Sequence, residues 1–301
     1  MAERVITVEG RDVRMSSLER VLWPGLGLTK AWLADYYVRI APVLLPHLRR
    51  HPITLHRFPE GVTGPHFFQT RVPPRPEWVE AVTFRMPRTG KVFDVAVVDD
   101  LAGLLWAVNL STIELHPYLG VVGDLDHPAA VVFDLDAGPP AGLHEACAVA
   151  LLVRDLCRSV GLASYAKTSG GGGMHVYVPV TSATYDETKA FARAIAGLLA
   201  REFPDRVVDK MTKSLRAGKV FIDWSQNDPG KSTVVAYSIR ATTPPLVSAP
   251  VTWGEVEEAV AVRDARPLLL GPDDVLRRVD DVGDLWAPVL AEPQPLRAFG
   301  R

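Results

Sequence analysis

The segment Val131–Ala137 reads V-V-F-D-L-D-A, an apolar strand that ends in two acids, Asp134 and Asp136, one residue apart. Side chains alternate between the two faces of a strand, so both carboxylates project from the same side. Together they offer the oxygen donors that a hard divalent cation prefers. A solvated strand end is the alternative interpretation of an isolated D-x-D pair. The segment therefore predicts a strand of a buried sheet and a candidate metal site.

A third acid follows in a second short strand. Lys219–Ser225 reads K-V-F-I-D-W-S, with Asp223 set among hydrophobic side chains. A carboxylate is costly to bury there unless it is paired or bound to a metal. Three carboxylates on two adjacent strands suit two cations, the arrangement that promotes phosphoryl and nucleotidyl transfer. We predict Asp134, Asp136 and Asp223 as catalytic metal ligands for Mn²⁺ or Mg²⁺ at a two-metal site.

Four glycines, Gly170–Gly173, join two β-like segments between these acids. Glycine lets successive backbone N–H groups converge on an anion, and Ser169 and His175 add side-chain donors at the edges. A flexible hairpin turn is the alternative, because the loop lacks the lysine of a Walker motif and no helix follows at once. The loop is a candidate cradle for a triphosphate.

Cations downstream of the loop are candidates for contact with phosphates. These are Arg216, Lys219 and Arg240, for each of which a solvated basic face is the alternative. The net charge of the chain is −2, yet residues 206–240 hold seven Lys and Arg against three Asp. Phosphate contacts need local positive potential rather than a basic total. The net charge is therefore compatible with phosphate contacts in this range.

Ordered motifs along the chain carry a family resemblance. They include V-L-W-P-G-L-G-L-T-K, H-R-F-P-E-G-V, H-F-F-Q, I-E-L-H-P, F-D-L-D, T-S-G-G-G-G-M-H-V-Y, M-T-K-S-L-R-A-G-K-V-F-I-D-W-S-Q-N and A-Y-S-I-R. In this order they resemble the polymerase domain of the bacterial end-joining ligase LigD, a member of the archaeo-eukaryotic primase superfamily. The likeness covers nearly the whole chain.

The resemblance implies roles position by position. The three aspartates match the metal-binding acids of the family. His116 and His175, which without the family are equally well core histidines, match nucleotide-site residues. An unaided interpretation of Phe67 and Phe68 favours core packing, although adjacent positions on a strand face opposite sides. The expected nucleotide-binding residues are His116, Ser169, Gly170, His175, Lys219 and Arg240. The expected DNA and 5′-phosphate contacts are Arg20, Lys30, Arg57, Phe67, Phe68 and Arg216.

Two positions depart from the family pattern. Relatives usually carry a lysine in the loop, S-G-x-K-G, where this chain has Gly172, and His56 replaces a more usual basic residue before Arg57. Loss of a phosphate-facing ammonium should weaken triphosphate binding, or shift that task to Lys219, Arg240 or the metal. The affinity for nucleotide is therefore expected to be reduced.

The layout is α/β (α+β). We expect an N-terminal α/β module over residues 1–128 that contributes DNA contacts, and a primase-like catalytic core over 129–292 with a split βαβ sheet in β-α-β-β-α-β order. Residues 293–301 are expected to be a flexible tail, and all parts to pack as one compact unit. A helix from Thr29 to about Leu48 and a strand over Thr233–Ile239 are among the predicted elements.

Composition agrees with a cytosolic enzyme, and the family resemblance implies a place in the bacterial nucleoid. The 301 residues are 48% hydrophobic, enough for a sizeable core, and no apolar run approaches the length of a membrane span. The N-terminus does not resemble a signal peptide. Cys147 and Cys157 fall on opposed sides of one predicted helix, which indicates buried, reduced thiols.

These observations predict a repair primase-polymerase that extends DNA 3′ ends at gaps or double-strand breaks with nucleoside triphosphates, preferring ribonucleotides. A primer-independent primase and a non-catalytic module that bridges DNA ends are the alternatives. A metal-dependent nuclease also uses carboxylate clusters but needs no triphosphate cradle. Because the sequence stops at Arg301, we expect a DNA ligase in trans as a partner, together with a Ku-like end-binding protein.

Overall fold

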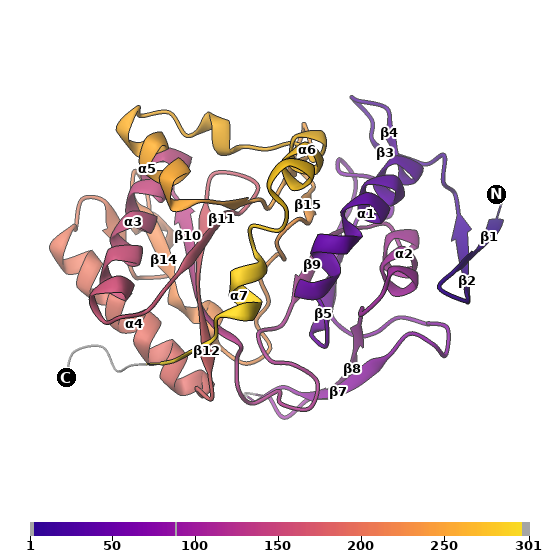
Figure 1. Ribbon diagram of the computed structural model, residues 1–301, viewed down its shortest axis with the longest axis horizontal. Coiled ribbons are helices and arrows are strands. Elements are labelled where there is room, and N and C mark those ends of the chain that lie inside the picture. The colour runs from indigo at the N-terminus through magenta and orange to yellow at the C-terminus, as the bar shows by residue number, and fades with distance from the viewer. Residues whose placement is uncertain (1–2, 88, 297–301) are drawn as a thin grey trace. The chain divides into compact units, whose positions relative to one another are not determined.

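The computed structural model describes residues 3–87 and 89–296. It divides into two compact units, each assembled from separate stretches of chain. The first unit comprises Met1–Tyr118, Ser232–Leu246 and Gly271–Gly283, and the second comprises Leu119–Lys231, Val247–Leu270 and Asp284–Arg301. Figure 1 shows helices and strands mixed along the whole chain, so the predicted α+β class is confirmed.

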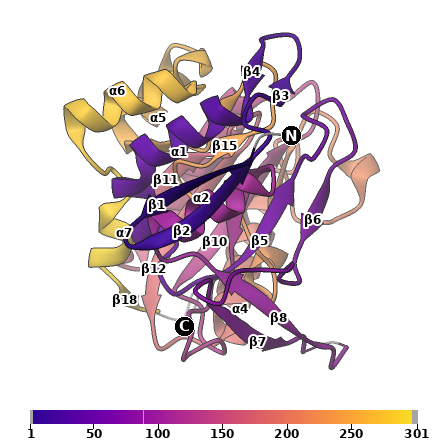
Figure 2. The same cartoon turned by 90° about the vertical axis from the view of Figure 1, so that its right-hand side faces the viewer.

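The first unit is built around a five-stranded antiparallel sheet. Strand β5 (Pro52–Arg57) is its centre, and pairs with β9 along one edge and with β8 and β6 along the other. The hairpin of β1 and β2 lies against helix α2, as Figure 2 shows. The remaining elements of this unit are β1 (Glu3–Val8), β2 (Arg11–Ser16), β3 (Val21–Trp23), β4 (Leu28–Thr29), α1 (Lys30–Leu44), β6 (Phe67–Gln69), β7 (Ala81–Arg85), β8 (Val92–Val97), α2 (Leu101–Asn109), β9 (Thr112–Pro117), β15 (Ile239–Arg240) and α6 (Pro272–Val282).

Helix α1 begins where the sequence predicts. The Thr29 hydroxyl accepts a hydrogen bond from the Trp32 backbone N–H, which satisfies one of the free donors of the first turn. Its buried face repeats at helical spacing through Leu33, Tyr37 and Ile40. The helix ends at Leu44, earlier than predicted, and a short 3₁₀ turn over Leu45–His47 replaces the last turn.

The first unit differs in composition from the predicted N-terminal module of residues 1–128. Its first stretch of chain ends at Tyr118, and two later stretches, Ser232–Leu246 and Gly271–Gly283, also belong to it. A polar contact explains why Ser232–Leu246 belongs to this unit, because the Ala241 N–H donates to Glu114 Oε1 of β9 over 3.0 Å. Gly271–Gly283 belongs to the unit because it contains helix α6, which packs on α1.

The second unit contains the predicted split βαβ sheet. Strands lie in the order β13-β14-β10-β12-β11-β17, and β12 runs antiparallel between β10 and β11. Helices α3 and α4 lie beside this sheet in Figure 1 and contribute to its apolar core. The elements of the unit are β10 (Ala130–Ala137), α3 (Leu143–Ser159), β11 (Tyr165–Thr168), β12 (Met174–Thr181), α4 (Tyr185–Glu202), β13 (Val207–Val208), β14 (Val220–Asp223), β17 (Pro250–Val251), α5 (Trp253–Ala261), α7 (Ala287–Ala291) and β18 (Gln294–Pro295). The two residues of β16 (Leu246–Val247) are divided along the chain between the first unit and the second.

Alternation along β10 separates core from site. Phe133 and Leu135 are fully buried in the core cluster, as are Val176 of β12 and Ile222 of β14. The residues between them, Asp134 included, project from the other face of the sheet. A strand of two-residue period therefore supplies both the packing and the acids.

Other predictions meet different outcomes. The strand predicted over Thr233–Ile239 is wrong, because Tyr237 adopts a φ of 70° and the chain turns there, leaving only β15.

Cys147 and Cys157 are buried and unbridged, as predicted, and burial raises the pKa of each thiol to about 12. Of the predicted tail, residues 294 and 295 form β18, and 297–301 lie outside the described residues. Within the described chain, no helix combines the length and apolar character needed to span a bilayer.

Candidate active site

A row of four polar side chains crosses the sheet of the second unit. Asp223 of β14 pairs with Asp134 of β10, Asp134 pairs with His175 of β12, and His175 pairs with Lys167 of β11. Directly paired positions on antiparallel strands project from the same face. Asp136, two residues after Asp134, shares that face. Strand register thus brings together the three acids and the histidine that the sequence predicts.

The two paired aspartates are linked by an amide. Gln226 Nε2 lies 3.3 Å from Asp134 Oδ2 and 3.2 Å from Asp223 Oδ2, so its N–H groups donate to both carboxylates. Ser225 holds the other oxygen of Asp223, with its hydroxyl 2.6 Å and its backbone nitrogen 3.0 Å from Oδ1. Each carboxylate therefore has an orientation set by neighbouring donors.

Asn227 fixes this turn against the strand of acids. Its side chain is fully buried and bonds both backbone groups of Val132, accepting from the N–H over 2.8 Å and donating to the C=O over 2.7 Å. The Asn227 amide thus supplies hydrogen bonds to the backbone of β10 beyond the point where β14 ends. This places the segment after Asp223 beside β10 and Gln226 beside Asp134.

Lys167 determines the hydrogen-bonding state of His175. The lysine is 1% exposed, and its Nζ donates to His175 Nδ1 over 2.8 Å and to Ser248 Oγ over 2.7 Å. Because an ammonium has donors and no acceptor, Nδ1 must present its lone pair. The ring proton then resides on Nε2, which lies 3.2 Å from Asp134 Oδ1. His175 therefore points an N–H at the acid.

The donor set fits a hard divalent cation. Three carboxylates on one face of a sheet repel one another unless positive charge lies between them. Gln226 supplies partial positive charge at the point between Asp134 and Asp223 where a cation would be held. Carboxylate oxygens are the ligands that Mg²⁺ and Mn²⁺ prefer.

The glycine loop is a tight hairpin between β11 and β12. The Ser169 N–H donates to Gly173 O over 3.0 Å, and Gly170 adopts a φ of 77° that favours glycine. A Cβ at Gly173 would lie 2.7 Å from Leu135 O, so a side chain there is excluded. Around Gly172, in contrast, nothing described lies within 4 Å of a Cβ. The hairpin turn that the sequence analysis gave as the alternative is therefore present, and a role of the loop as a phosphate cradle stays a prediction.

The two cations before β14 lie differently. The Arg216 guanidinium carbon is 3.7 Å from the centre of the Phe221 ring, and Phe221 pairs with Asp136. Arg216 thus lies on the face that carries the acids. Lys219 Nζ donates to Pro204 O over 2.7 Å, at the opposite end of β14 from Asp223. The fold does not direct Lys219 at the acids.

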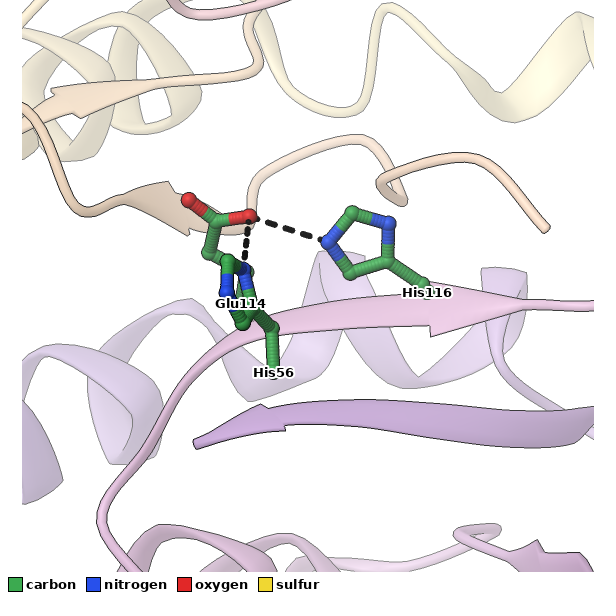
Figure 3. Close-up of side chains that lie close together, drawn as sticks. All are labelled: His56, Glu114 and His116. Carbon is green, nitrogen blue, oxygen red and sulfur yellow. Dashed lines mark hydrogen bonds and ion pairs between the residues drawn. The ribbon is translucent and has the colours of Figure 1, made fainter. Parts of the chain in front are cut away.

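A second polar cluster lies on the sheet of the first unit. Glu114 Oε2 accepts from His56 Nδ1 over 2.9 Å and from His116 Nε2 over 3.0 Å, and both rings point at this one oxygen in Figure 3. Arg240 Nε lies 3.2 Å from the other oxygen. Burial alone would raise the pKa of Glu114, but the two histidines and the Arg240 charge outweigh it and hold that pKa well below its usual range. Burial lowers the pKa of His116, against the opposing effect of its hydrogen bond to Glu114.

The aromatic pair lies beside this cluster. Phe67 and Phe68 are 44% and 57% exposed, so the core packing favoured by unaided sequence interpretation is wrong for both. Phe68 stacks on His56 with ring centres 3.9 Å apart, and the Arg57 guanidinium carbon lies 5.3 Å from the centre of the Phe67 ring. Strand β6 is three residues long and at the sheet edge, which leaves these rings uncovered.

Arg20 and Lys30 are brought together by the short β3–β4 hairpin. Val21 pairs with Thr29, and the Lys30 N–H donates to Arg20 O over 2.8 Å. The Lys30 side chain is only 2% exposed and its Nζ donates to Asn109 O and Oδ1 over 3.0 and 3.1 Å. Burial, with the nearby Arg20 charge, lowers the pKa of Lys30 to about 8. Arg20 donates to Pro59 O.

Sequence interpretation gave no role to several residues at these clusters. Gln226 and Asn227 stand inside the quoted motif F-I-D-W-S-Q-N, where two amides directly after an acid were the available signal. Lys167 directly precedes the motif T-S-G-G-G-G-M-H-V-Y, and a lysine in an apolar strand is the signal for a buried partner. Glu114 lies two residues before His116 in I-E-L-H-P, a spacing that places both on one face of a strand.

Comparisons with known proteins show which family the chain is similar to. The model of the family "LigD, primase-polymerase domain" matches residues 29–286. The multifunctional non-homologous end joining protein LigD of Mycolicibacterium smegmatis is 37% identical over 286 residues, which are 93% of this chain and 36% of that protein. The bifunctional LigD of Bacillus subtilis is 28% identical over 292 residues, 95% of this chain and 46% of that protein.

A solved structure gives the same result. The polymerase domain of Mycobacterium tuberculosis Ligase D in complex with DNA is 34% identical, with a TM-score of 0.83 over 93% of this chain and 98% of that one. The chain spans less than half the length of the curated relatives named above. Since the family model covers most of the chain, the chain belongs to the LigD primase-polymerase family.

Proposed function

We propose that this protein is a nucleotidyltransferase that extends a DNA 3′-hydroxyl with nucleoside triphosphates at gaps or broken ends. The row of Asp223, Asp134 and His175 across one sheet face is the observation that carries the proposal. Paired carboxylates with an oriented N–H beside them are suited to phosphoryl chemistry, in which catalysis is mostly positioning and charge stabilisation.

Each residue of the row has a proposed task. Asp134, Asp136 and Asp223 would hold Mg²⁺ or Mn²⁺, which when bound stabilises negative charge on the reacting phosphoryl group. His175 presents its Nε2 proton, and Lys167 prevents the ring from turning that nitrogen into an acceptor. Ser169 and Gly170 would bind triphosphate oxygens at the hairpin. In the first unit, His116 and Arg240 would contact the nucleotide.

DNA is the proposed polymeric substrate. The solved polymerase domain of Mycobacterium tuberculosis Ligase D is a complex with DNA, which supports this assignment. The exposed Phe67 and Phe68 are proposed to stack on template bases, a contact worth roughly 1–3 kcal/mol per base. A ligase in trans and a Ku-like end-binding protein are proposed as partners in end joining, in the nucleoid.

Primer extension tests the proposal. The assay uses gapped, recessed and blunt DNA with Mn²⁺ or Mg²⁺, and supplies NTP or dNTP. We expect template-directed addition to the 3′ end, with faster addition of ribonucleotides. Dinucleotide synthesis on unprimed single strands would instead favour a primase, and binding without any addition would favour a bridging module.

Replacing Gly172 by lysine is expected to lower the KM for nucleotide several-fold. A single added charge-assisted hydrogen bond to phosphate contributes roughly 1–2 kcal/mol. The open space around a Cβ at Gly172 makes the change sterically acceptable. Gly171→Lys is the matched control, because its Cβ is equally open and it adds the same charge at the neighbouring position. Equal KM values in both variants and the wild type would show that the loop does not contact phosphate.

Binding of a 5′-phosphate at Arg20 and Lys30 is expected to weaken as the pH rises. Lys30 has a pKa of about 8 in the free protein, and a bound phosphate would raise that pKa. Affinity for gapped DNA with a 5′-phosphate should therefore fall about tenfold between about pH 7 and pH 9, as one charge-assisted contact is lost.

Fluorescence anisotropy on matched gaps measures this effect. The same gap ending in a 5′-hydroxyl is the control, and its affinity should change little over that pH range. Arg20→Ala combined with Lys30→Met should erase the preference for the phosphorylated gap. Equal affinity of the wild type for both gaps at about pH 7 would contradict the assignment.

A further inference from the structure

The first unit contains a compact group of metal-ligating side chains. His56, Glu114 and His116 each offer one donor atom, and these atoms all lie within 4.8 Å of one another. All three residues are buried, at 7%, 4% and 7% exposed. Among residues 3–87 and 89–296, this is the one set of three such residues that meets so closely. Buried polar side chains converging on one point are a stronger signal than exposed acids.

Strand pairing explains why the donors converge. His56 of β5 lies directly opposite Glu114 of β9, and His116 follows Glu114 by two residues on the same face. His56 Nδ1 and His116 Nε2 approach Glu114 Oε2 to 2.9 and 3.0 Å. Figure 3 shows both nitrogens aimed at that oxygen. The site therefore follows from register and not from flexible loops.

Surrounding contacts hold the donors in place. The second carboxylate oxygen of Glu114 accepts from Arg240 Nε and the Ala241 N–H, so Oε2 is the oxygen that faces the rings. His56 Nε2 lies 2.9 Å from His66 Nδ1, so His66 could accept the His56 proton once it moved from Nδ1 to Nε2, which would make Nδ1 available as a ligand. Phe68 stacks on the His56 ring at an interplanar angle of 15°.

We propose that His56, Glu114 and His116 bind a late first-row divalent metal ion such as Zn²⁺. Two neutral imidazoles and one carboxylate are the donors that such ions prefer, whereas Mg²⁺ prefers oxygen alone. The ion would take the place of the two imidazole protons now directed at Glu114 Oε2, each of which would move to the other nitrogen of its own ring, and a water would complete the coordination. The three aspartates of the second unit are not involved.

Arg240 limits the affinity of this site for a divalent metal ion. Its guanidinium Nε lies 3.2 Å from Glu114 Oε1 and adds positive charge close to the ion. Glu114 supplies one negative charge against the Arg240 cation and a divalent ion. We therefore expect moderate binding, weaker than that of a structural zinc site with cysteine ligands.

Cobalt titration of the full chain tests the site. Co²⁺ is a visible probe because coordination by imidazole at low coordination number gives strong d–d absorption, and excess Mg²⁺ is included to occupy oxygen-only sites. We expect one equivalent of Co²⁺ to give a visible band that Zn²⁺ then removes. No band and no Zn²⁺ binding by calorimetry in the wild type would overturn the proposal.

Substitutions assign the ligands. His56→Gln and His116→Gln should each weaken Co²⁺ binding by at least about tenfold, since even a change outside the ligand set costs 10–100-fold. His51→Gln is the matched control, because His51 belongs to the same unit but its Nδ1 donates to Tyr118 O instead. Circular dichroism checks that each variant is folded. If both folded ligand variants bind Co²⁺ as tightly as the His51 control, the ion lies elsewhere and the proposal fails.

Discussion

Replacing Asp223 by alanine is expected to abolish primer extension, with a loss of at least about a hundredfold, the cost of removing one preorganised charge-stabilising group. Asp223 is paired directly with Asp134 and shares Gln226 with it, so the two carboxylates form one binding surface. Asp134→Ala should have the same effect. Single-nucleotide addition to a recessed primer measures it, and residual turnover above roughly a tenth of the wild type would contradict the catalytic role.

The same variants should separate catalysis from stability. Without added metal, loss of one carboxylate from a like-charged group relieves repulsion, so the unfolding temperature should not fall. With Mn²⁺ at about a hundredfold excess over Kd, the wild type should gain about 2.7 kcal/mol, several degrees in Tm, and the variants much less. Asp205→Ala, an exposed acid of the same unit, is the control and should behave as the wild type. An equal metal-dependent shift in Asp223→Ala would place the metal elsewhere.

Local sequence patterns predicted much of the second unit. The period-two alternation of Val131–Ala137 puts Phe133 and Leu135 in the core and Asp134 on the opposite face, as the structure has it. The β-α-β-β-α-β order followed from helix and strand periodicity. What periodicity did not reveal is register: only pairing shows that Asp223, Asp134, His175 and Lys167 lie in one row.

Long-range contacts explain what the sequence did not predict. Ser232–Leu246 falls inside the predicted catalytic core of residues 129–292. The Ala241 N–H and Arg240 nevertheless bond Glu114, over a hundred residues earlier, and the segment belongs to the first unit. The turn at Tyr237 was equally invisible, since a tyrosine at positive φ contradicts its local preference for strands. Exposure of Phe67 and Phe68 depends on the sheet edge, which only the fold reveals.

Replacing Lys167 by methionine is expected to lower kcat by about tenfold or more, because a 1 Å misplacement near the chemistry is costly. Lys167 is 1% exposed, and its Nζ bonds His175 Nδ1 and Ser248 Oγ. Methionine fills a similar volume but has no N–H group to donate a hydrogen bond to the lone pair on His175 Nδ1. The His175 ring can then exchange its protonated nitrogen and lose the N–H directed at Asp134. The KM for primer-template DNA should stay near the wild-type value.

Single-turnover kinetics with saturating nucleotide measures this loss and separates it from weaker binding. Lys189→Met is the matched control: Lys189 lies on α4 of the same unit and is paired with Asp228, so kcat should change little. The burial of Lys167 means that its removal also relieves a desolvation cost, so lost activity need not come with lost stability. A folded Lys167→Met variant with wild-type kcat would show that Asp134 orients His175 unaided. A variant with unchanged kcat and raised KM for DNA would instead move the role of Lys167 from the chemical step to substrate binding.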